Sequence, residues 1–104
     1  MKQNFDEGWF YLCRTELALK NYNEAVEAGS KAVELKPSYA DYRNCLGEAF
    51  RGNGSCRRAI MEFEESIRQN VYYADAYFNL AITYILNEIN RDRKSTRLNS
   101  SHRL

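Results

Sequence analysis

The sequence predicts an all-α fold, in which antiparallel helix-turn-helix hairpins stack as a short α-solenoid of about five helices. Apolar residues recur at three- and four-residue steps along most of the chain, which is the spacing of one buried helical face. No alternating strand pattern of useful length occurs. Residues 6–39, residues 40–73 and the chain from residue 74 also align without a gap, and this 34-residue period is typical of stacked helical hairpins.

The first hairpin is predicted from two amphipathic stretches and two breaks. Residues 5–19 form the first expected helix, and Asn21 interrupts it. Residues 23–35 form the second, and Pro37 ends it because proline lacks the amide donor that a continuing helix needs. The connection is short, so the two helices must lie antiparallel.

The second hairpin and one further helix repeat this arrangement. Helices are expected over residues 39–51 and 56–69, separated by the turn Gly52-Asn53-Gly54-Ser55. A fifth helix is expected over residues 73–87. Small residues at matched positions should let the helices approach, and large aromatic residues should fill the gaps beside them. We therefore expect a buried core, rather than a cofactor site, that includes Leu12, Ala25, Gly47, Ala59 and Ala81 together with Trp9, Phe50, Tyr77 and Tyr84.

The repeated anchors resemble the tetratricopeptide repeat (TPR) family. They are Trp9, Leu12, Ala25, Ala32 and Pro37 in the first unit, Leu46, Gly47, Phe50, Ala59 and Phe63 in the second, and Tyr77, Leu80, Ala81 and Tyr84 in the third. The resemblance implies a right-handed solenoid with one TPR-like repeat at residues 6–39, a second at 40–73 and the first helix of a truncated third at 74–90. Four positions depart from the family's pattern: Cys13, Gly29, Ser66 and Val71.

The composition is that of a small globular domain. The chain has 104 residues, of which 44% are hydrophobic and 28% charged, which suffices for a single core. It contains no apolar run long enough to span a membrane and does not begin like a signal peptide, so a cytoplasmic location is the default expectation. Three cysteines without CxxC spacing favour buried free thiols over a disulfide framework or a zinc site.

The end of the chain has an unusual origin. Residues 92–102, DRKSTRLNSSH, match the translation of a common sequencing-library adapter codon by codon. We therefore interpret residues 91–104 as an artefactual or disordered basic tail, and we expect the true protein to continue beyond residue 90. Leaving out the four basic and one acidic residues after Arg91 changes the formal net charge from +1 to −2. No nucleic-acid partner is then indicated.

Catalysis has little support in the remaining sequence. The single histidine, His102, lies in the adapter-like segment, so no Ser-His, Cys-His or His-metal arrangement can be built from residues 1–91. The Gly52-Asn53-Gly54 turn lacks the lysine of a phosphate-binding loop. Glu62, Glu64 and Glu65 lie near several arginines and are better explained as a solvated, partly paired helix face. We expect no enzyme activity, no cofactor and no metal.

The resemblance implies a concave groove that accepts a peptide. In the family, the first helix of each hairpin lines this groove. By this resemblance, Phe10 and Phe78 of this chain are candidate aromatic anchors, and Arg14 and Arg51 are candidate partners of a carboxylate on the ligand. Members that bind a chaperone's C-terminal carboxylate use a clamp of lysine, asparagine and arginine. Here those positions carry Phe10, Arg14, Cys45, Asp75 and Asn79, so such binding is disfavoured. The groove residues expected by resemblance are Glu7, Phe10, Arg14, Leu17, Asn44, Glu48, Arg51, Phe78, Ile82 and Ile85.

Three functions remain open from the sequence. The primary hypothesis is a non-catalytic scaffold that binds a peptide or partner protein on its concave face. The alternative is a docking or regulatory segment of a larger enzyme, for example a glycosyltransferase or signalling protein. The third is a purely structural spacer with no groove ligand. For Phe78 and Ile82 alone, the alternative is that they only pack under a sixth helix or later repeats. Self-association is also expected through the uncapped fifth helix, at Tyr77, Phe78, Ile82, Ile85 and Leu86.

Overall fold

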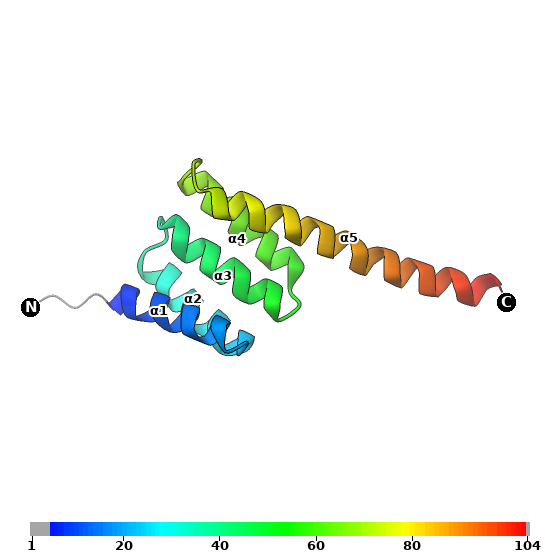
Figure 1. Cartoon of the computed structure of the whole chain (residues 1–104), viewed down its shortest axis with the longest axis horizontal. Helices are drawn as coiled ribbons and strands as arrows, with labels where there is room; N and C mark the ends of the chain where they lie inside the picture. Colours follow the sequence, from blue (N-terminus) through cyan, green and yellow to red (C-terminus); the bar gives the residue numbers. More distant parts are fainter. Residues whose placement is uncertain (1–4, 104) are drawn as a thin grey trace, which may run out of the picture.

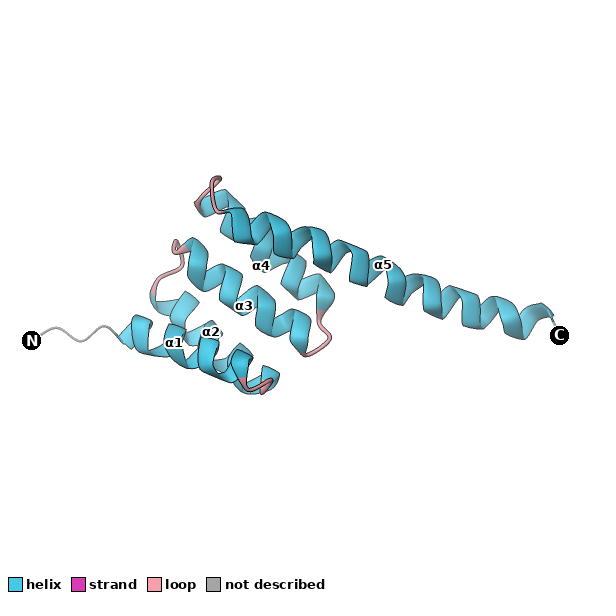
Figure 2. Cartoon of the chain, viewed as in Figure 1, coloured by secondary structure: helices cyan, strands magenta, loops and turns pink. Residues whose placement is uncertain are grey.

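The computed structural model describes the backbone of residues 5–103 and the side chains of residues 5–93. Five helices follow one another in the order α1 (Phe5–Ala18), α2 (Tyr22–Leu35), α3 (Ala40–Gly52), α4 (Cys56–Gln69) and α5 (Ala74–Arg103). Short turns connect them, and residues 5–103 contain no strand (Figure 2). The all-α prediction is confirmed, and the first four helices begin and end within about one residue of their predicted bounds.

The helices form two antiparallel hairpins and a fifth helix that lies on the second hairpin. The pairs α1/α2 and α3/α4 are in contact along their lengths, α2 packs on α3, and α4 packs on α5. The first helices also touch, α1 against α3 and α3 against α5 (Figure 1). The arrangement is therefore a solenoid in which α1, α3 and α5 share one face.

The two hairpins fill their cores in opposite ways. In the second hairpin, Gly47 of α3 faces the fully buried Phe63 of α4, and a Cβ on Gly47 would lie 2.5 Å from the ring. In the first hairpin the aligned positions hold Cys13 on α1 and Gly29 on α2, so the larger side chain comes from the other helix. A Cβ on Gly29 would lie 3.1 Å from Cys13 Sγ. Two of the departures from the family's pattern therefore compensate each other.

A third departure makes a buried hydrogen bond. Ser66, fully buried on α4, donates from its hydroxyl to the carbonyl of Ala40 at 2.7 Å. Ala40 is the first residue of α3, so this bond ties the end of α4 to the start of the helix it pairs with. A serine is tolerated where the family prefers alanine because its hydroxyl is satisfied.

Several expected core residues are not buried. Leu12 is 42% exposed, Tyr77 47% and Tyr84 44%, and Ala81 is also exposed. The helices α3 and α4 pack mainly against the opposite side of α5, so Tyr77 and Ala81 are left exposed. Tyr84 reaches α4 through its hydroxyl, which donates to Glu64, but 44% of it stays exposed. The prediction of a buried position is therefore wrong for these four residues, and it is confirmed for Ala25, Gly47, Phe50 and Ala59.

The fifth helix is longer than predicted. It was expected to end at residue 87, whereas α5 ends at Arg103. Residues 88–103 contain neither proline nor glycine, so nothing in their sequence stops a helix. The adapter interpretation concerns the origin of that sequence and is independent of its conformation.

Candidate functional site

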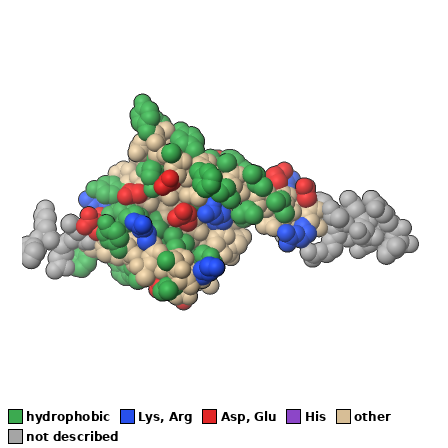
Figure 3. Space-filling model, in the orientation of Figure 1, with side chains coloured by type: hydrophobic (Ala, Val, Ile, Leu, Met, Phe, Trp, Pro, Cys, Tyr) green, Lys and Arg blue, Asp and Glu red, His purple; other side chains and the backbone are tan. Residues whose placement is uncertain are grey.

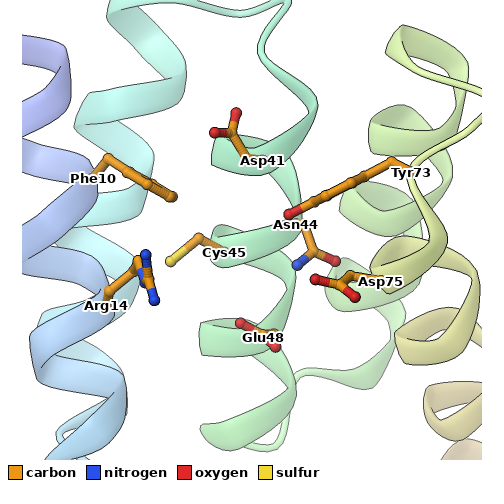
Figure 4. Close-up of a pocket in the computed structure, with 8 residues that line it drawn as sticks. All are labelled: Phe10, Arg14, Asp41, Asn44, Cys45, Glu48, Tyr73 and Asp75. Atoms are coloured by element: carbon orange, nitrogen blue, oxygen red, sulfur yellow. The ribbon is translucent and has the colours of Figure 1, made fainter.

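A hollow of ≈ 290 Å³ opens on the shared face of α1, α3 and α5. Figure 4 shows side chains from three segments around it, with α1 on one side, α3 in the middle and the start of α5 on the other. Its size is at the lower end of the range for small-ligand pockets, about 300–1,000 Å³, so it suits one side chain of a larger ligand. The lining residues are Phe10 and Arg14 from α1, Asp41, Asn44, Cys45 and Glu48 from α3, Tyr73 just before α5, and Asp75.

The α1 wall of the hollow is held by aromatic and polar contacts. Phe10 stacks on the buried Tyr42 of α3, with ring centroids 4.8 Å apart and an interplanar angle of 29°. The Tyr42 hydroxyl donates to Asp6 Oδ2 at 2.7 Å, which ties the start of α1 to α3. The Arg14 guanidinium carbon lies 5.8 Å from the Phe10 ring centroid, a cation–π distance. Phe10 is thus preorganised rather than free to turn away.

A polar network joins α3 to α5 beside the hollow. The buried Asn79 donates from Nδ2 to Asn44 Oδ1 at 3.0 Å and to Glu48 Oε2 at 3.3 Å. Arg51 donates to Asn79 Oδ1 at 3.1 Å. The buried Thr83 hydroxyl donates to the Asn79 carbonyl at 2.6 Å. Each buried group has a partner, so the network fixes the position of α5 on α3.

Acidic groups dominate the electrostatics of the hollow. Its lining holds the carboxylates of Asp41, Glu48 and Asp75 but only one guanidinium, that of Arg14. Burial raises the pKa of Glu48, Asp75 adds to the rise, and Arg51, Asn79 and Arg14 oppose it. Burial and then the charges of Asp75, Asp41 and Glu48 raise the pKa of Tyr73 to about 12. The hollow therefore disfavours additional negative charge.

A second hollow continues the groove along α1 and α3. It is lined by Leu17, Ala18 and Tyr22 on the first hairpin and by Glu48, Arg51 and Gly52 on α3. Glu48 belongs to both hollows, so the two are neighbours. Of the ten groove residues expected from the sequence, the structure brings six together here: Phe10, Arg14, Leu17, Asn44, Glu48 and Arg51.

The other four expected residues line neither hollow. Glu7 is exposed in the first turn of α1. Phe78 and Ile85 are 68% and 60% exposed on α5, and Ile82 is half-buried. Phe10 therefore lines the hollow, whereas Phe78 lies on the exposed surface of α5.

Sequence reasoning did not include four residues of the first hollow in the groove. Cys45 and Asp75 occupy positions of the carboxylate clamp that the sequence disfavours. The sequence offers Asp41 and Asp75 as part of an acidic line that could attract a basic peptide, but their places in the first turns of their helices explain them equally well. Tyr73 was missed because it lies in the connection before α5. A usable signal existed for the two aspartates, since Glu7, Asp41 and Asp75 share one position of the 34-residue period.

The uncovered side of α5 is a distinct apolar surface. Figure 3 shows hydrophobic side chains along this helix, whereas acidic and basic side chains mix over α1 and α3. We call this set the α5 face. Its large exposed residues are Tyr77, Phe78, Tyr84, Ile85, Leu86 and Ile89.

The three carboxylates of α4 have partners in the described structure. Glu62 pairs with Arg43 at 3.1 Å, Glu65 pairs with Arg68, and Glu64 accepts a hydrogen bond from Tyr84 at 2.9 Å. The prediction of a partly paired face is confirmed. Among the described residues, no group of three or more potential ligands is placed to hold a metal ion. None of the helices in that part of the chain has the length and apolar character needed to cross a membrane.

These observations define a helical-repeat protein whose first helices line a groove. Residues 14–54 match the profile of the family described as TPR repeat. The Sgt2 TPR domain from Aspergillus fumigatus is similar over 80% of this chain and 55% of its own, with a TM-score of 0.76 and 17% identity. TTC0263, a thermophilic TPR protein from Thermus thermophilus, is similar over 85% of this chain and 50% of its own, with a TM-score of 0.71 and 28% identity.

The chain accordingly has the fold of TPR α-solenoids, and residues 14–54 resemble the TPR repeat family in sequence. It spans about half the length of these two solved structures. Repeats of this family commonly serve as protein-interaction modules.

Proposed function

We propose that this chain is a non-catalytic interaction module that binds a peptide or partner protein on its concave face. One observation carries the proposal: three segments far apart in the sequence converge on one hollow that presents an aromatic ring, an amide and charged groups. Convergent polar groups beside an apolar wall are typical of a binding site. Phe10 supplies the apolar wall, and its contact with Tyr42 reduces the entropy lost when a ligand packs against it.

The charges favour a ligand with a basic side chain at this point. Three carboxylates and one guanidinium leave the lining with an excess of negative charge, which attracts an ammonium or guanidinium group. A carboxylate-binding clamp is not supported, since Asn79, at one of the clamp positions, already bonds to Asn44, Glu48 and Arg51. Turning the Asn79 side chain toward a ligand would leave Asn44, Glu48 and Arg51 without their hydrogen-bond partner.

Fluorescence anisotropy with labelled peptides tests the proposal. A peptide selected from an immobilised library is compared with versions in which its basic residues are replaced by glutamine. Asp75→Asn should weaken binding roughly 3–30-fold by removing one charge near the ligand, and Phe10→Ala should weaken it more. Glu34→Gln, on the exposed side of α2, is the matched charge control. Equal affinity for the glutamine peptide, or equal loss with Glu34→Gln, would contradict the proposed charge preference.

We also propose that the α5 face mediates self-association. Six large apolar side chains on it are between 39% and 68% exposed. At about 200 Å² for each fully exposed side chain, they contribute roughly 600 Å² of accessible surface. Two copies together would bury about 1,200 Å², the lower limit of a standard interface. Sedimentation equilibrium should detect a concentration-dependent dimer that Phe78→Ser with Ile85→Ser abolishes, and a monomer up to about 100 µM would contradict this.

A further inference from the structure

Two cysteines from different repeats meet beneath the groove. Cys13 on α1 is fully buried, Cys45 on α3 is 3% exposed, and their sulfur atoms lie 3.0 Å apart. Cys45 also lines the hollow that Phe10 and Arg14 border (Figure 4). Cys56, on α4, is buried as well but makes no contact with another cysteine in the described structure. The chain therefore holds one thiol pair and one isolated thiol in the same protein.

We propose that Cys13 and Cys45 form a reversible disulfide that links α1 to α3, with an oxidised low-molecular-weight thiol such as oxidised glutathione as the co-reactant. The sulfur atoms need to approach by only about 1 Å to reach the length of a disulfide bond. The link would join α1, which forms one wall of the hollow, to α3, which lies in the middle of it.

The exchange proceeds in two balanced steps. The Cys45 thiol, which borders the hollow, loses its proton to solvent, and the thiolate attacks one sulfur of oxidised glutathione. The glutathione disulfide breaks, one glutathione leaves, and Cys45 carries the other as a mixed disulfide. The Cys13 thiolate then displaces this second glutathione. Two protein thiols are thereby oxidised by two electrons, and one small disulfide is reduced to two thiols.

The resting structure keeps this pair unreactive. The hydrogen bond with Cys13 and burial raise the pKa of the Cys45 thiol, and the nearby Arg14 opposes the rise. Because the thiolate is the reacting species, exchange depends on openings of α1 that expose both sulfur atoms. α1 contacts only α2 and α3 among the described helices, so such openings do not require the whole protein to unfold.

The test is to incubate the purified chain with excess oxidised glutathione at pH 8 and follow its thiols. Free thiols should fall from three to one, and the intact mass should decrease by about 2 Da for the two hydrogens lost. After acid quenching and trypsin digestion, residues 3–14 should be linked to residues 44–51, whereas the Cys56 peptide, residues 52–57, should stay free. Dithiothreitol should reverse the change.

Variants separate the pair from the isolated thiol. Cys56→Ser should behave as the unaltered chain, and Cys13→Ser should stop at the mixed disulfide on Cys45. The peptide map of the unaltered chain decides the matter even if a variant fails to fold. Three free thiols after prolonged incubation, an unresolved glutathione adduct on the unaltered chain, or a link that includes Cys56 would each overturn the proposal.

Discussion

Gly47→Ala tests the close contact on which the second hairpin depends. The added Cβ would lie 2.5, 2.7 and 2.9 Å from three ring atoms of Phe63. Phe63 is fully buried, so its ring has no free space to enter, and overpacking of this kind costs about 1–3 kcal/mol. Alanine in place of glycine returns about 1 kcal/mol of helix propensity. We therefore expect a net loss of up to about 2 kcal/mol in the free energy of unfolding.

Urea unfolding followed by circular dichroism at 222 nm measures this loss, and Tm should fall by up to about 15 °C. Gly8→Ala is the matched control, since a Cβ on Gly8 meets nothing within 4 Å in α1. That change should stabilise the protein by about 0.5–1 kcal/mol. If Gly47→Ala is as stable as Gly8→Ala, the contact with Phe63 is not as close as described. A double mutant with Phe63→Leu should recover part of the loss, because the smaller side chain relieves the overlap.

Three further predictions concern the groove and the end of the chain. Asn79→Leu should cost about 1–3 kcal/mol by leaving Asn44 and Arg51 without their partner, and hydrogen exchange should show lost protection in α5 rather than in α1. Glu48 has a pKa that burial raises above its value in the unfolded chain, so stability should fall as pH rises from the unfolded pKa through the folded one. Glu48→Gln should remove that fall. If urea unfolding gives the same difference in free energy of unfolding between variant and parent at every pH from 4 to 8, the prediction is contradicted. Resequencing the source DNA across the codons for residues 89–92 should replace the DRKSTRLNSSH segment with a different continuation, whereas its persistence in clean DNA would refute the adapter interpretation.

The repeat was predictable because it is periodic. Aligning the chain with itself at 34 residues places Leu46 over Leu12 and Ala59 over Ala25, and helical spacing, Pro37 and the Gly52–Ser55 turn then fix four helices. The α5 boundary was not predictable in the same way, because residues 88–103 carry no glycine or proline to end the helix.

Burial at the ends of the stack could not be inferred from the repeat. The same repeat position is buried at Leu46 and 42% exposed at Leu12, because a helix covers only the first of them. Tyr77 and Tyr84 are exposed for the same reason. The sequence pattern predicts which face of a helix is apolar. Whether that face is buried depends on whether another helix packs against it.

Parts of the groove also depend on pairs that a single-residue comparison does not reveal. Cys13 and Gly29 each depart from the family's pattern, and only their contact shows that one compensates the other. Asn79 resembles a ligand-binding asparagine in position, but its bonds to Asn44, Glu48 and Arg51 occupy it within the protein. These relations join residues 16 to 35 positions apart in sequence, beyond the reach of local periodicity.

The most direct test of an interaction module with a concave binding face is an NMR titration. Uniformly ¹⁵N-labelled protein is mixed with the peptide of highest affinity from the library, and amide shifts are followed to saturation. We expect the largest shifts at Phe10, Asn44, Glu48 and Asp75, and small shifts at Glu27 and Glu34 on the exposed side of α2. Saturable shifts confined to α2 and α4, with none at the hollow, would contradict the assignment of the binding face.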